Sequence, residues 1–214
     1  MGKSCLQCGG TGTLVSGLPC PDCAKEVLGK KISVAGIPVQ YQGKNFDRDF
    51  LPNELIKSPY ADFMEKLYTE IVQNTAIFQK TYLIISRPNS GKTVWAYSVY
   101  SQLTSKGYKL PLLKDINEVK SILSYQGSAE DADLFSNSRC AIIKIPSDAT
   151  PWSFDTIRAV VERRVRNNGF TIFLFSGTMR ELERADRNNI LRDIRGTGAF
   201  NTIAVKDYGR KDYE

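Results

Sequence analysis

The chain of 214 residues contains no histidine, and this absence removes two classes of chemistry. An enzyme that uses histidine as a general acid or base is excluded, and so is a metal centre with imidazole ligands. No run approaches the ~18 consecutive apolar residues of a membrane helix, and the first residues, MGKSCLQCGG, lack the apolar core of a secretory signal. We therefore expect a cytoplasmic protein without a membrane partner.

Cysteine is scarce and unevenly placed, because four of the five cysteines fall within the first 23 residues. They form two C-x-x-C hooks, Cys5 with Cys8 and Cys20 with Cys23. Four thiolates complete the tetrahedral coordination of zinc, so we expect a structural Zn²⁺ there. Two disulfides or a redox pair are the alternatives, and neither explains paired hooks in a chain without a secretory signal. Cys140, inside the apolar run CAIIKI, is expected to be a buried thiol.

The formal net charge of +6 permits attraction to nucleic acid but does not require it, since the same charge also serves solubility. Basic residues gather in IRAVVERRVRNN and RNNILRDIRGTG, so the charge is not evenly spread. The composition, 42% hydrophobic and 24% charged residues, is that of an ordinary globular protein with one main domain.

Short apolar segments alternate with segments of helical periodicity along the chain. We predict helices over 58–75, 92–107, 116–125, 153–169 and 179–194, and strands over 81–86, 109–114, 140–145, 170–176 and within 199–208. Residues 126–134 are expected to form a polar loop. This alternation favours an α/β fold, in which a parallel sheet carries helices on both faces.

Three parts follow from this pattern. Residues 1–30 are expected to form the zinc ribbon, residues 31–56 a linker that docks on the core, and residues 57–214 the α/β domain, for which the loop described next predicts nucleotide binding.

The segment SRPNSGKT, residues 86–93, has the end of the phosphate-loop pattern G-x-x-x-x-G-K-[ST] but not its first glycine. The expected strand before it and helix after it are the context that the pattern needs. In such a loop the backbone N–H groups bind phosphate oxygens, the lysine adds a charge and the hydroxyl helps to hold magnesium. We predict that nine consecutive residues bind a nucleotide: Ser86, Arg87, Pro88, Asn89, Ser90, Gly91, Lys92, Thr93 and Val94.

The first position of the loop holds Ser86, and its suitability depends on the backbone φ that the position requires, since only glycine adopts positive φ freely. Asn89 is better placed, because asparagine tolerates the left-handed region more readily than most residues.

Hydrolysis requires a second feature, an acidic residue at the end of the next buried strand, where it orients magnesium or its water. In AIIKIPSD that place holds Lys144 or Ile145, and an ammonium group only donates hydrogen bonds. Asp148 is the candidate catalytic acid, and Asp131 and Asp133 are weaker candidates. The sequence leaves open whether the chain hydrolyses ATP and whether it binds Mg²⁺.

Four motifs occur in an informative order: the four-cysteine knuckle with CGGTG, then AGIPVQYQGKNF, then the strand and phosphate loop, then VVERRVRNNGFTIFLFS. Together they resemble the DnaC/DnaI-like replicative helicase loaders, AAA+ proteins that are related to bacterial initiators and often carried by phages and mobile elements. The resemblance spans nearly the whole chain and implies an AAA+ P-loop domain after a small zinc ribbon. In that family a glycine-isoleucine-proline followed by an aromatic introduces the ATPase core, as Gly36, Ile37, Pro38 and Tyr41 do here.

The resemblance also implies roles for arginines. In the family a run of the form R...G.PTI..SN carries an interface arginine and the sensor strand, and Arg163 or Arg164 takes the place of that arginine. A terminal R..R supplies an arginine finger to the neighbouring subunit, and Arg192 and Arg195 stand in that stretch. Each of these arginines also fits a solvated helix face.

Three departures from the family pattern point toward weak or absent hydrolysis: Ser86, Lys144, and Ser176 or Gly177 in place of the sensor asparagine. Both Walker motifs are thus degenerate. We expect a helicase-loader-like replication protein that binds ATP or ADP through Lys92 and Thr93, assembles with itself, and contacts a replicative helicase or single-stranded DNA. A pseudo-ATPase scaffold and an ATPase accessory protein of recombination or transposition remain alternatives.

Overall fold

The fold is taken from a computed structural model, which describes residues 37–41, 46–47, 51–73, 81–111, 113–124, 127–196 and 203–207. The predicted zinc ribbon, with Cys5, Cys8, Cys20 and Cys23, lies outside the described residues, as does part of the predicted linker.

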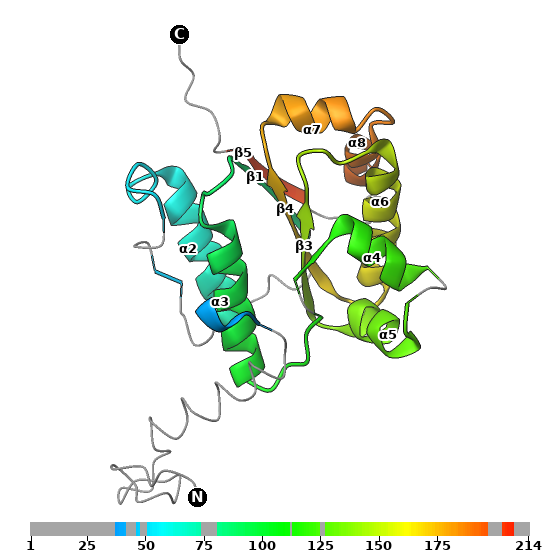
Figure 1. The fold of residues 1–214 in the computed structure, drawn as a ribbon, viewed down its shortest axis with the longest axis horizontal. Coiled ribbons are helices and arrows are strands. Elements are labelled where there is room, and N and C mark those ends of the chain that lie inside the picture. Colours follow the sequence, from blue (N-terminus) through cyan, green and yellow to red (C-terminus); the bar gives the residue numbers. More distant parts are fainter. Residues whose placement is uncertain are drawn as a thin grey trace, which may run out of the picture.

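A parallel sheet of five strands forms the centre of the domain (Figure 1). Its order is β2 (Lys114–Asp115), β3 (Cys140–Ile145), β4 (Phe170–Ser176), β1 (Thr81–Ser86) and β5 (Ile203–Asp207). Every neighbouring pair of strands is parallel. All six residues of β1 are buried, as expected of a strand covered on both faces. The parallel sheet predicted from the sequence is confirmed.

Helices cover both faces of the sheet (Figure 1). On one face lie α2 (Pro59–Val72), α3 (Lys92–Ser105) and the short 3-10 helix η1 (Val39–Tyr41). On the other face lie α4 (Ile116–Leu123), α5 (Ala129–Asn137), α6 (Pro151–Arg166), α7 (Met179–Ala185) and α8 (Ile190–Gly196). None of the helices in the described part of the chain has both the length and the apolar character that a bilayer crossing demands.

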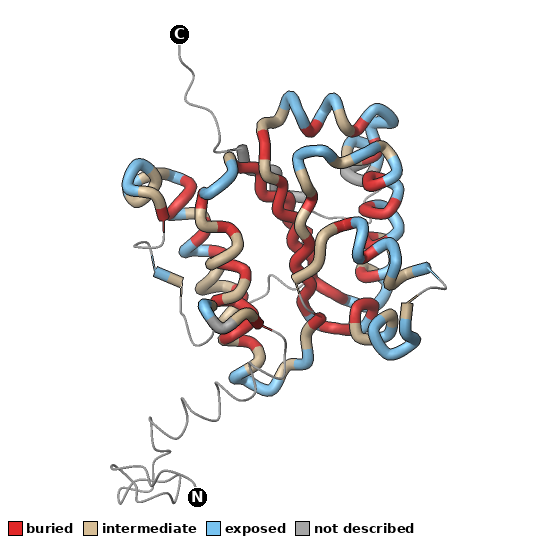
Figure 2. Tube along the Cα trace, in the orientation of Figure 1, coloured by how far each residue is buried: buried red, intermediate tan, exposed pale blue. Residues whose placement is uncertain are grey.

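The two faces of the sheet have separate hydrophobic cores, and Figure 2 shows the buried residues concentrated along the strands and on the inner sides of the helices. Residues alternate between these cores along β1, β3 and β4. In β3, Ile142 belongs to the core under α2 and α3, whereas Ile143 and Ile145 belong to the core under α4 and α6. The sheet therefore places successive side chains in different environments.

Helix α2 begins where the sequence predicted. The Ser58 hydroxyl accepts the backbone N–H of Ala61, and Pro59 occupies the first helical position.

Three elements differ from their predictions. The strand predicted over 109–114 is reduced to the two residues of β2. The predicted polar loop contains α5, which begins with the Ser128 hydroxyl accepting the N–H of Asp131. The helix predicted over 179–194 is interrupted after Ala185, because the buried Asp186 carboxylate accepts the N–H groups of Ile190 and Leu191 and starts α8 anew.

Because β2 pairs with only two residues of β3, the backbone N–H and C=O groups of Ile142 on that side need another partner. Tyr100 of α3 provides it: the hydroxyl accepts the N–H of Ile142 at 3.0 Å and donates to the carbonyl of the same residue at 3.4 Å. A side chain thus takes the place of a strand residue. Burial raises the pKa of this phenol, so it stays protonated and able to donate.

Candidate functional site

The candidate phosphate loop connects β1 to α3 and lies where β1 and β4 end. Two of its residues have positive φ, Asn89 at 60° and Gly91 at 79°. Gly91 is the N-cap of α3 in the left-handed conformation, which glycine adopts without a steric cost. The sequence-based expectation for Asn89 agrees with its left-handed backbone.

Ser86, which replaces the first glycine of the pattern, is the last residue of β1 and is not among the described residues with positive φ. Its position therefore does not require glycine. The serine hydroxyl instead bonds to the Ser90 hydroxyl at 2.7 Å across the loop. Tyr60 of α2 braces the loop from the other side, because its hydroxyl donates to the Ser90 carbonyl at 3.1 Å.

Lys92 is 6% exposed and turns back over its own loop. Its ammonium donates to the carbonyl and hydroxyl of Ser86 at 3.0 and 2.8 Å, to the carbonyl of Arg87 at 2.8 Å, and to the hydroxyl of Ser90 at 3.0 Å. Burial lowers the pKa of Lys92 to about 8. All four acceptors come from the loop itself, so an incoming phosphate can exchange for them without disturbing the rest of the fold.

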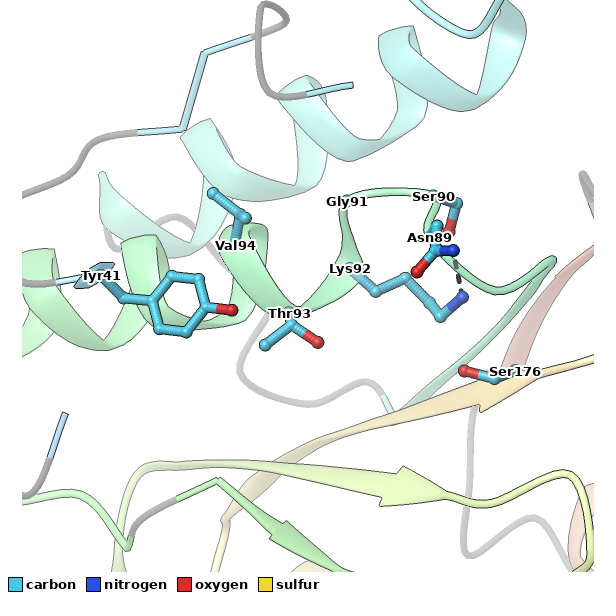
Figure 3. Close-up of a pocket in the computed structure, with 8 residues that line it drawn as sticks. All are labelled: Tyr41, Asn89, Ser90, Gly91, Lys92, Thr93, Val94 and Ser176. Atoms are coloured by element: carbon cyan, nitrogen blue, oxygen red, sulfur yellow. Dashed lines mark hydrogen bonds between the residues drawn. The ribbon is translucent and has the colours of Figure 1, made fainter. Parts of the chain in front are cut away.

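A cavity of about 320 Å³ opens beside the loop, as Figure 3 shows. It is lined by Tyr41, Asn89, Ser90, Gly91, Lys92, Thr93, Val94 and Ser176. The N-terminus of α3 has no side-chain cap, and its first backbone-bonded N–H is that of Trp95, which donates to the Gly91 carbonyl. The preceding N–H groups of this 14-residue helix remain available to bind an anion. Helix end, lysine and cavity together form a phosphate site.

Six of the nine predicted nucleotide-binding residues, from Asn89 to Val94, line the cavity, and the three at the start of the loop do not. Ser86 acts behind the cavity through Lys92, and Arg87 pairs with Glu54 at 2.6 Å on the outer side. Pro88 is exposed. These three are not among the cavity-lining residues.

Tyr41 of η1 is a lining residue that the sequence did not predict as part of the site. It stacks on Tyr97 of α3, with ring centroids 4.6 Å apart and planes 18° from parallel. In Figure 3 it lies at the opposite end of the cavity from the Lys92 ammonium. The cavity therefore has one aromatic and one cationic end. The only sequence signal was an aromatic after Gly-Ile-Pro, which by itself indicates no contact with a ligand.

The side chains around the cavity do not fit a magnesium site. Among the lining residues that the structure describes, none has a carboxylate, and Thr93 offers one hydroxyl. Mg²⁺ in phosphate sites is usually held by one or two carboxylates together with the phosphates. No cluster of three or more potential metal ligands occurs in the described ranges.

The candidate catalytic acids lie away from the cavity lining. Asp148 is exposed in the turn after β3. Asp131 accepts the Ser128 hydroxyl at 2.7 Å, and Asp133 accepts the side-chain amide of Asn137 at 2.6 Å, both on α5. Helix α5 leads into the start of β3, whereas the loop lies at the carboxyl ends of the strands. Asp131 and Asp133 thus serve local helix contacts.

The arginines predicted at a subunit interface have different environments. Arg164 is 0% exposed, so the interpretation of this residue as an interface arginine is wrong. Its guanidinium makes five hydrogen bonds, to Thr171, Phe135, Phe170 and twice to Ser138. It joins α6 to β4 and to the segment before β3.

Two other arginines remain available for an interface. Arg163 is exposed on α6, and the Arg192 side chain on α8 is 77% exposed, with Nε 3.9 Å from the carboxylate of Asp193. Backbone atoms place Arg195 in the same helix.

No family model matches the sequence, and no curated protein matches it closely. Solved structures do share the fold. The DnaC helicase loader has 16% identity and a TM-score of 0.54, and the match covers 78% of this chain and 99% of that one. DnaI has 14% identity, a TM-score of 0.55 and coverage of 83% and 94%. The replication initiator DnaA bound to AMPPCP and single-stranded DNA has 8% identity, a TM-score of 0.54 and coverage of 75% and 50%. The chain therefore has the α/β P-loop fold of the DnaC and DnaI helicase loaders.

Proposed function

We propose that this protein binds ATP or ADP in the cavity beside α3 and uses the nucleotide in DNA replication, in the manner of a helicase loader. The observation that carries the proposal is the phosphate loop: Lys92 lies over the uncapped N-terminus of α3, and all of its hydrogen bonds to described residues are to the loop. A replication initiator of the same fold is bound to the nucleotide analogue AMPPCP, which supports the nucleotide as ligand.

The role in replication is supported by fold and motif order together. Structures with this fold include a helicase loader, DnaI and a replication initiator, and the initiator is bound to single-stranded DNA. The sequence adds the motifs of the helicase-loader family and a net charge of +6. A replicative helicase and single-stranded DNA are accordingly the proposed partners. The four-cysteine segment, as a structural zinc site, would be the part that contacts one of them.

Hydrolysis is proposed to be weak or absent. An attacking water needs an acidic residue or a polar side chain that orients it near the γ-phosphate. The end of β3 offers Lys144, the end of β4 offers Ser176, and Asp148 is exposed in the following turn. Nucleotide then acts as a ligand that favours one conformation or assembly state over another.

The test is nucleotide binding measured by titration calorimetry with ATP and with ADP. Lys92→Met removes the ammonium while retaining most of the side-chain volume, and we expect it to weaken binding about a hundredfold, because a buried charge-assisted bond to phosphate is lost. Lys109→Met, at an exposed lysine beyond the C-terminus of α3, is the control of equal charge. If the parent protein binds no nucleotide, the alternative of a pseudo-ATPase scaffold explains the fold better.

Self-assembly has its own test. If Arg192 acts as a finger toward the nucleotide of a neighbouring copy, Arg192→Ala removes ATP-dependent assembly while the monomer keeps its stability, because the side chain is exposed. Sedimentation with and without ATP measures this. Assembly that is unchanged in Arg192→Ala would remove the finger assignment but leave nucleotide binding untouched.

A further inference from the structure

The position that holds a magnesium-binding acid in P-loop ATPases is occupied by Lys144 at the end of β3. Lys144 follows Ile142 by two residues, so both side chains leave the sheet on the same face. Ile142 packs in the core under α2 and α3. The Lys144 side chain therefore points to the face on which α3 and the phosphate loop lie.

The register of the strands places Lys144 near the carboxyl ends of the strands, where the cavity lies. Lys144 pairs with Leu174 on β4, and Ser176, two residues further along β4, lines the cavity. Only Ile145 follows Lys144 in β3. A four-carbon side chain at this position has a flexible ammonium close to the strand end, which suits a contact with a ligand beyond it.

The Lys144 side chain is half-buried, and neither a hydrogen bond nor an ion pair joins its ammonium to any residue that the structure describes. Asp115, its partner in the register of β2 and β3, is already in use, because one carboxylate oxygen accepts the N–H groups of Asn117 and Glu118 at the start of α4. A partly desolvated ammonium is stabilised by an anion, and a nucleotide phosphate in the cavity would supply one.

We propose that this protein binds its nucleotide without Mg²⁺, and that the Lys144 ammonium provides the positive charge that the metal supplies in P-loop ATPases. The inference rests on the proposed nucleotide site. Two observations support it: the described cavity lining has no carboxylate, and a lysine occupies the position of the expected metal ligand. A nearby ammonium also repels a divalent cation. An ammonium donates hydrogen bonds to phosphate oxygens but accepts none, so it neither coordinates the metal nor activates a water.

The experiment is a calorimetric titration of the full-length protein with ATP, once in excess MgCl₂ and once in EDTA, at equal ionic strength. We expect the wild-type protein to bind ATP in EDTA at least as tightly as in MgCl₂. Lys144→Met should bind about tenfold more weakly in EDTA, since one charge-assisted hydrogen bond is lost. Lys109→Met, with the same change of charge, should bind as the wild type does.

Lys144→Asp restores a carboxylate at this position and should make ATP binding at least tenfold tighter in MgCl₂ than in EDTA. If MgCl₂ instead tightens ATP binding by the wild-type protein more than tenfold, and Lys144→Met behaves as Lys109→Met, the inference is overturned while the proposed nucleotide site stands. Absence of ATP binding by the wild-type protein under both conditions would overturn both. The wild-type comparison uses no variant, so it is valid even if a substitution impairs folding.

Discussion

Lys92 and Arg164 are both buried cations, but their hydrogen-bond partners are arranged differently. Arg164 donates five hydrogen bonds to groups from α5, the segment before β3, and β4, and its guanidinium lies 5.6 Å from the Phe135 ring. Among the residues that the structure describes, Lys92 donates only to its own loop, beside a cavity. Partners on all sides make a cation structural, whereas partners on one side leave it able to bind a ligand.

Substitution of Arg164 should give the largest effect. Arg164→Met leaves several buried carbonyl and hydroxyl groups without donors, so we expect the free energy of unfolding to fall by about 3 kcal/mol. Urea denaturation measures the change. Arg163→Met, at the exposed neighbouring position, is the matched control and should change it by less than about 0.5 kcal/mol. Unchanged stability of Arg164→Met together with lost assembly would return Arg164 to an interface role.

At Lys92 the expected effect is on ligand binding, as a dependence of the nucleotide affinity on pH. Burial lowers the pKa of the free protein's Lys92 to about 8, and phosphate favours the charged form. Below pH 8 the ammonium is already charged; above it, binding must take up a proton, so affinity should fall by up to about tenfold per pH unit. Titrations from pH 7.5 to 9.5 measure this, and Lys92→Arg, which stays charged, should lose the dependence if it still binds.

The same lowered pKa of Lys92 makes the free energy of unfolding of the free protein rise with pH, whereas the nucleotide affinity falls. Between the folded pKa of about 8 and the unfolded value of 10.5, the unfolded chain binds more protons. This contribution to the stability of the free protein therefore rises with pH across that window.

For the titration of nucleotide binding, an affinity that does not fall above pH 8 would show that the Lys92 ammonium is not the group that binds phosphate.

The smallest effect is expected at Ser86. Ser86→Gly restores the usual glycine of the loop but removes the hydroxyl that accepts from Lys92. Ser86 is not among the described residues with positive φ and lies behind the cavity lining, and the Lys92 ammonium keeps three other acceptors in the loop. We therefore expect the nucleotide affinity to change by less than about threefold. A gain or loss beyond tenfold would make Ser86 a direct determinant of phosphate binding.

The phosphate loop and most strands were predictable because their signals are local. β-rich apolar runs, a glycine at the helix start and the spacing to Lys92 all lie within a short segment. The burial of Arg164 was not predictable, since Arg163 and Arg164 stand side by side in one basic run and only packing decides which faces inward. The contact of Tyr41 with the cavity is also tertiary, because more than 40 residues separate it from the loop.

Helix α5 was missed for a related reason. Its sequence, AEDADLFSN, is polar, and only Phe135 and Ser136 are buried. The only local signal for a helix is the capping residue Ser128, and the segment lacks the apolar face by which a helix is usually recognised. The interruption at Asp186 depends on a carboxylate turning back to the next helix, which a continuous helical pattern does not indicate.

The hydroxyl of Tyr100 has a consequence beyond the domain itself. A sheet edge with free N–H and C=O groups is a template on which another chain can add a strand and begin to aggregate. Ile142 has both groups occupied by a side chain of the same molecule, so a foreign strand cannot pair there without first displacing a buried aromatic ring. The edge strand β2 has only two residues, so this contact blocks strand addition at a position of β3 that β2 does not cover.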